Sequence, residues 1–90
     1  MLDYTILPDH IQSGVKLYIE EGVPPGYFLQ QVICNKLKES FEYADDINQM
    51  RMFDIVKFFY NEAPLNCWGS KEIMEAWIER GGLNGRGEQG

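Results

Sequence analysis

The chain of 90 residues has only one histidine and two cysteines. Cys34 and Cys67 are too few and too far apart in the sequence for a disulfide framework or a zinc site. Cys34 lies among apolar residues, where a free thiol behaves as a small hydrophobic group. His10 has no marked nucleophile and orienting acid beside it, and a catalytic triad needs all three groups. The scarcity of both residue types therefore argues against metal and triad chemistry.

Other patterns of catalytic and cofactor sites are missing too. The pairs Glu20-Glu21 and Asp45-Asp46 are not preorganised for acid–base catalysis, because adjacent residues on a helix point in different directions. Asp45-Asp46 also lacks the spacing and glycine of a calcium loop, and helix capping explains it better. Gly81-Gly82 follows an expected helix, whereas a phosphate-binding loop follows a strand. We therefore expect a protein that is not an enzyme and that has no metal or cofactor.

Basic residues are scarce as well, since 8 Lys and Arg stand against 14 Asp and Glu. The resulting net charge of −6 argues against direct DNA binding, which needs clustered Lys and Arg. No apolar run approaches the roughly 20 residues of a membrane span. The first residues lack the basic start and apolar run of a signal peptide. We therefore expect a protein of the reducing cytoplasm that does not bind membranes.

The length and the apolar content indicate one small folded domain. Hydrophobic residues make up 44% of the chain and include five Tyr, five Phe and two Trp, which is typical of a globular core. A domain of this size buries only roughly 60% of the surface that its unfolded chain exposes. Assembly into a homo-oligomer is therefore one route to extra stability. We expect a single helical domain over residues 1–83 and a flexible, glycine-rich tail over 84–90.

Apolar residues recur at helical spacing in four segments. Asp9, Asp45 or Asp46, and Ser70 are suited to cap three of the helices, and Val23-Pro24-Pro25-Gly26 breaks the chain before the other. No stretch alternates apolar and polar residues long enough to predict a strand. The sequence predicts an all-α bundle of about four short helices. These helices are expected over residues 9–21, 25–43, 46–62 and 71–80.

The third segment has the widest apolar surface, and we take it as the central helix. We expect Phe53 and Val56 of this helix, together with Trp77 of the last helix, to be core residues. Two apolar stripes run along the segment, one formed by Ile47, Met50, Phe53, Val56 and Tyr60 and an adjoining one formed by Met52, Ile55 and Phe59.

Two loops are candidate binding regions. The turn Pro24-Pro25-Gly26 is stiff and is followed by two aromatic residues. Trp68 either packs beneath its own loop or stands out as an anchor for a partner. In an up-and-down bundle the two loops lie at the same pole, and loops on a rigid scaffold often carry binding residues. The predicted binding residues are Tyr27, Phe28, Glu62, Trp68 and Lys71.

Several segments of the chain resemble a group of small accessory proteins of tailed bacteriophages. The most specific are Asn61-Glu62-Ala63-Pro64 and Cys67-Trp68-Gly69-Ser70, and the similarity extends over roughly residues 9–83. The resemblance implies a phage product that acts in the cytoplasm of an infected bacterium, but it implies no catalytic or binding residue. The other similar segments are 10–15, 18–22, 25–29, Ala44-Asp45-Asp46, Trp77-Ile78 and Gly81-Gly82-Leu83.

Small phage accessory proteins without catalytic residues resemble counter-defence factors in size and charge. This likeness is an analogy between classes of protein and not a match of sequence motifs. The leading hypothesis is an inhibitor that binds a component of bacterial immunity. It would either dock on a host defence protein or sequester a small nucleotide signal. The alternative is a structural or regulatory subunit that assembles with a larger phage or host protein.

Overall fold

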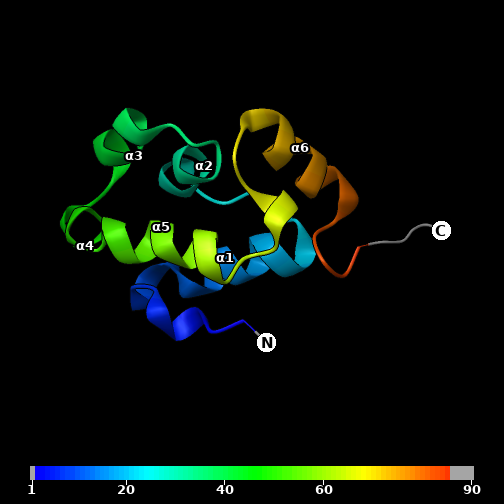
Figure 1. The fold of residues 1–90 in the computed structure, drawn as a ribbon, viewed down its shortest axis with the longest axis horizontal. Coiled ribbons are helices and arrows are strands. Elements are labelled where there is room, and N and C mark those ends of the chain that lie inside the picture. Colours follow the sequence, from blue (N-terminus) through cyan, green and yellow to red (C-terminus); the bar gives the residue numbers. More distant parts are fainter. Residues whose placement is uncertain (1, 86–90) are drawn as a thin grey trace.

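A computed structural model describes residues 2–85, and within that range every regular element is a helix (Figure 1). The predicted all-α class is therefore confirmed. None of the helices in this range is long and apolar enough to cross a membrane. The six α-helices are α1 (Asp9–Glu21), α2 (Tyr27–Ile33), α3 (Leu37–Tyr43), α4 (Asp46–Met50), α5 (Met52–Asn61) and α6 (Lys71–Arg80), and short 3-10 turns cover Tyr4–Ile6 and Leu65–Cys67.

The first and last helices have the predicted bounds. Helix α1 begins after Pro8 and ends before Gly22, whose φ of 70° turns the chain so that the Val23 N–H reaches the carbonyl of Leu17 at 3.3 Å. Helix α6 begins after Ser70, whose hydroxyl accepts a hydrogen bond of 3.1 Å from the Ile73 N–H. The prediction that Ser70 caps a helix is therefore confirmed. The prediction that Asp9 is a cap is wrong, because Pro8 takes the N-cap position of α1 and Asp9 lies in its first turn.

The second and third predicted helices are each broken into two, so the chain forms six helices where we expect four. Asn35 has a left-handed φ of 63°, which a helix does not accommodate, and it separates α2 from α3. Arg51 (φ −101°, ψ 12°) separates α4 from α5. The predicted apolar stripe of residues 25–43 divides accordingly. Its α2 residues are buried, whereas Leu37 of α3 is exposed.

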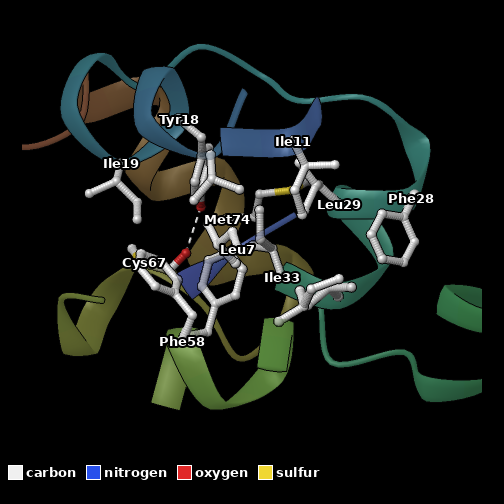
Figure 2. Close-up of a cluster of buried hydrophobic side chains, with 14 of the residues drawn as sticks. Leu7, Ile11, Tyr18, Ile19, Phe28, Leu29, Ile33, Phe58, Cys67 and Met74 are labelled. Carbon is white, nitrogen blue, oxygen red and sulfur yellow. Dashed lines mark hydrogen bonds between the residues drawn. The ribbon is translucent and has the colours of Figure 1, made fainter. Parts of the chain in front are cut away.

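The core lies between α1, α2, α5 and α6 and is shown in part in Figure 2. Tyr18 is fully buried, and its hydroxyl donates a hydrogen bond of 2.6 Å to the carbonyl of Cys67. Trp77 is also buried, which confirms its predicted place. Its Nε1–H lies 3.1 Å from the carbonyl of Tyr18 and 3.2 Å from that of Ile19, so the indole pairs with the last carbonyls of α1.

The prediction that Phe53 is a core residue is wrong. The structure turns Met52, Ile55, Phe58 and Phe59 of α5 toward the core, and Phe53 lies on the opposite side of the helix. The physical reason is that a short helix presents only one face to one core, and the stripe with adjacent phenylalanines is the better packed of the two. Val56 lies at the boundary, half-buried and packed against the core residues.

The chain after α6 is fastened to the end of α1. The N–H groups of Leu83 and Asn84 donate hydrogen bonds of 2.9 Å to the carbonyls of Ile19 and Glu20. The predicted flexible tail therefore does not include a free Asn84. The rest of the predicted tail lies mainly in residues 86–90, outside the described range.

Candidate functional site

The structure does not bring the predicted binding residues together on one surface. Tyr27 and Phe28 begin α2. The loop that carries Trp68 meets the other end of this helix, because the Gly69 N–H donates a hydrogen bond of 2.7 Å to the Ile33 carbonyl. The two predicted loops therefore lie at opposite ends of α2.

Trp68 packs against the core with part of its ring and leaves the rest exposed. Its ring is half-buried and its centroid lies 5.6 Å from that of Phe59. Glu62 lines a separate hollow that also includes Lys57. Lys71 is exposed and lies 3.9 Å from Glu75, and an exposed ion pair of this kind contributes little to stability.

A first candidate surface is the apolar side of α5 that faces solvent, which we call the α5 face. It consists of Phe53, Val56 and Tyr60. Phe53 is 75% exposed and Tyr60 is 79% exposed. Residues 53, 56 and 60 are spaced by three and four positions, which places their side chains on one side of the helix. The face is thus continuous along α5.

The exposed apolar area of the α5 face is larger than that of a single apolar side chain on a protein surface. A fully buried Phe or Tyr side chain covers roughly 150–250 Å². Phe53 and Tyr60 alone therefore present on the order of 300 Å² of largely apolar surface. Contiguous patches of a few hundred Å² often mark a binding site on a monomeric protein.

Two hollows adjoin on the α5 face and share Val56. One has a volume of about 350 Å³ and lies among Phe53, Val56 and Tyr60. The other, of about 100 Å³, lies between α3 and α5 and is lined partly by Leu37 and Trp68. A complementary side chain can enter either hollow, which is how anchors of an interface are buried.

The charged residues that line these hollows are both lysines. Lys57 lines the larger hollow, with its Nζ 5.7 Å from the centroid of the Phe53 ring, and Lys36 lines the smaller one. Within the described part of the chain neither lysine forms an ion pair. The charged side chains that line the two hollows of the α5 face are therefore basic, although Lys57 also lines the hollow that contains Asp54 and Glu62.

A second candidate surface is a pocket of about 370 Å³ between α1, the start of α2, and α4. It includes Tyr27 and Tyr43, whose ring centroids are 5.7 Å apart. At its edge His10 Nε2 lies 2.9 Å from Asp45 Oδ2. The hydrogen bond from the Asn48 backbone N–H, aided by His10, holds the pKa of the Asp45 carboxyl below its usual range. Asp45 is thus a carboxylate at neutral pH.

Neither cysteine is placed as a nucleophile. Burial raises the pKa of the Cys67 thiol to about 12, and burial also raises the pKa of Cys34. Thiols with raised pKa values are protonated at neutral pH and react slowly. Among residues 2–85 no group of three or more His, Cys, Asp or Glu side chains is arranged to hold a metal ion.

The chain matches no protein-family model, no curated protein and no solved structure with which it was compared.

Proposed function

We propose that this protein is a binding domain that docks on a partner protein through the α5 face. The observation that carries the proposal is the exposure of two large aromatic side chains, Phe53 and Tyr60, beside two adjoining hollows. In the infected cell that the phage resemblance implies, the partner is a component of bacterial immunity, and docking inhibits it.

Burial of the α5 face supplies a driving force for binding. Burying a Phe or Met side chain that is otherwise exposed contributes about 1.5–3 kcal/mol. Aromatic residues and Met are also enriched at protein interfaces relative to the rest of the surface. Phe53 and Tyr60 need little rearrangement to bind, because both extend from a helix whose other side is fixed in the core.

The charges of the α5 face indicate the chemistry of the partner segment. A straight apolar stripe on a helix fits an amphipathic helix with apolar residues spaced by three, four and seven positions. Lys57 and Lys36 flank this stripe, so the matching segment carries Asp or Glu beside its apolar anchors. We therefore propose an acidic amphipathic helix of the partner as the occupant.

Three other hypotheses about the function have less support. A second copy of the chain would bring Lys57 of each copy to the same interface, where the two ammonium groups repel each other. A nucleotide signal needs cations for its phosphates, and no Lys or Arg of residues 2–85 lines the pocket beside Tyr27. A structural phage subunit would use the same α5 face, and it differs only in the identity of its partner.

The proposal is tested with a displayed library of helical peptides, selected for binding to the wild-type protein. The comparison variant is Phe53→Ser with Tyr60→Ser. The matched control is Leu17→Ser, which removes an exposed apolar side chain from α1, on another element. We expect selected peptides to combine apolar residues at helical spacing with Asp or Glu. We also expect them to bind the double variant at least about tenfold more weakly than the control.

Two outcomes would contradict the proposal. One is selected peptides that bind wild type and the double variant equally. The other is a wild-type dimer in sedimentation that dissociates in the double variant, since that result would assign the α5 face to a second copy of the chain.

A further inference from the structure

Helix α3 has its apolar residues turned away from the core. Ser40 is its only buried residue, and the Ser40 hydroxyl donates a hydrogen bond of 2.7 Å to the Lys36 carbonyl one turn earlier. Leu37 is 67% exposed and Phe41 is 42% exposed. Helix α2 has the same length and buries four apolar residues. The pattern of α3 is therefore the reverse of the one expected for a helix on the surface of a monomer, which turns its apolar side inward.

Helix α3 has little packing of its own to stabilise it. It packs mainly on α2, and Figure 1 shows it at the outer edge of the molecule, with α2 between it and α6. A helix of 7 residues is marginal in water, because most helical stability in proteins comes from packing of the apolar side. A contact that covers Leu37 and Phe41 therefore stabilises the helix that presents them.

Leu37 and Phe41 form a small surface together with an ion pair beside them, Lys38 and Glu42, and we call these four residues the α3 face. Leu37 and Phe41 are four positions apart, so their side chains are neighbours along the helix. Lys38 and Glu42 each follow one of them by one position, which places both charges on the same flank. Lys38 Nζ lies 3.3 Å from Glu42 Oε2, and both side chains are more than half exposed. Each charge can therefore form a second ion pair with another molecule.

The order of residues on the α3 face makes it complementary to itself. When two copies meet about a two-fold axis with their α3 helices antiparallel, the start of one helix lies opposite the end of the other. Leu37 then packs on Phe41 of the second copy, and Lys38 lies opposite Glu42 of the second copy. The four charges alternate in sign beside the apolar contact, and such a network contributes more than an isolated exposed pair.

We propose that two copies of this chain associate through their α3 faces, with Lys38 of each copy paired with Glu42 of the other. A stable interface buries about 800 Å² on each partner, and the α3 face offers only two apolar side chains. The association is therefore weak and depends on protein concentration. The inference does not rest on the proposed function, because Phe53 and Tyr60 of the α5 face take no part in it.

The test exchanges charges between copies and measures association by sedimentation equilibrium of the full chain, from about 10 μM to 1 mM. We expect wild type to approach twice the monomer mass at the highest concentration. Lys38→Glu gives the α3 face two acidic residues, and Glu42→Lys gives it two basic ones. We therefore expect each variant alone to associate at least about tenfold more weakly than wild type.

An equimolar mixture of Lys38→Glu and Glu42→Lys is the decisive sample. The mixture brings opposite charges together again, so we expect it to associate at least about tenfold more strongly than either variant alone. The ion pair within one helix is lost in both variants and is not restored by mixing, so this gain arises only between copies. Lys16→Glu makes the same change of net charge on an exposed residue of α1 and is the matched control, with the association of wild type expected.

Leu37→Ser tests the apolar part of the contact. Its side chain is largely exposed, so we expect the variant to remain helical in circular dichroism and to associate at least about tenfold more weakly than wild type. Three results would each overturn the inference. They are a wild type that stays monomeric at about 1 mM, a mixture no tighter than its separate variants, and a dimer that dissociates in the variant Phe53→Ser with Tyr60→Ser.

Discussion

Tyr18 joins two distant parts of the chain through a single hydroxyl group. The hydrogen bond of 2.6 Å from this hydroxyl fastens the 3-10 turn at Cys67 to α1, and both residues are fully buried. Burial of the two side chains also raises the pKa values of the Tyr18 hydroxyl and of the Cys67 thiol. Both groups stay protonated in the folded protein at neutral pH.

Removing the Tyr18 hydroxyl tests this contact. We expect Tyr18→Phe to lower the free energy of unfolding by about 1–3 kcal/mol, because the buried carbonyl of Cys67 loses its partner. Tyr60→Phe removes the same atom from an exposed ring and is expected to change stability by less than about 0.5 kcal/mol. Urea denaturation of both variants measures the difference, and equal midpoints would show that the buried hydrogen bond contributes nothing.

The raised pKa of Cys67 predicts how stability changes with pH. Burial raises the pKa of the Cys67 thiol to about 12 in the folded protein, whereas the ordinary pKa of an exposed thiol is 9.0. Between these values the unfolded chain has released the proton and the folded chain has kept it, so stability falls as pH rises from about 9. We expect the urea midpoint of wild type to fall between pH 8.5 and about 10.5. We expect a smaller fall in Cys67→Ala, and an identical fall in both proteins would show that other groups cause it.

Phe53 and Phe58 differ in burial although both lie on α5. Phe58 is fully buried, so we expect Phe58→Ala to cost about 3–5 kcal/mol. Phe53→Ser replaces an exposed ring and is expected to cost less than about 1 kcal/mol. Chemical denaturation of the two variants is the measurement. A large loss of stability in Phe53→Ser would show that Phe53 is a core residue.

At the scale of the helices, caps and breaks differ in how well the sequence predicts them. The bounds of α1 and α6 follow from Gly22 and Ser70, which act through hydrogen bonds to residues within one turn. The break at Asn35 was not predicted, although it is a local helix end. Asn35 adopts a left-handed φ, and the Lys36 N–H donates a hydrogen bond of 2.9 Å to the Gln31 carbonyl. Asparagine is a less frequent signal of this helix end than glycine, and the helical spacing of apolar residues continues through it.

The close approach of the ends of α1 and α6 gives a prediction about glycine. Gly82 has a φ of 71°, and a Cβ there would lie 2.6 Å from the backbone nitrogen of Gly22. We expect Gly82→Ala to lower the free energy of unfolding by about 2–3 kcal/mol, because the strained conformation and the clash add. Gly26→Ala is the control, since its added Cβ would meet nothing within 4 Å. Similar thermal midpoints for the two variants would contradict the account.

At the scale of the whole molecule, the sequence predicts the fold class and most of the core but not the candidate sites. The sequence pattern shows two apolar stripes over residues 46–62, and from it we predict that Phe53 and Val56 are core residues. A core of this size accommodates only one of the stripes, and only the packed structure shows which. The pocket beside Tyr27 and Tyr43 was missed because it joins α1, α2 and α4 across the fold. Its tyrosines have no distinctive spacing in the sequence.

Calorimetric titration of a selected acidic helical peptide tests most directly whether the α5 face binds a partner protein. Wild type and Leu17→Ser are predicted to bind this peptide alike. The double variant Phe53→Ser, Tyr60→Ser is predicted to bind at least about tenfold more weakly while its circular dichroism remains helical. Undiminished affinity in a folded double variant would contradict the claim and place the binding surface elsewhere.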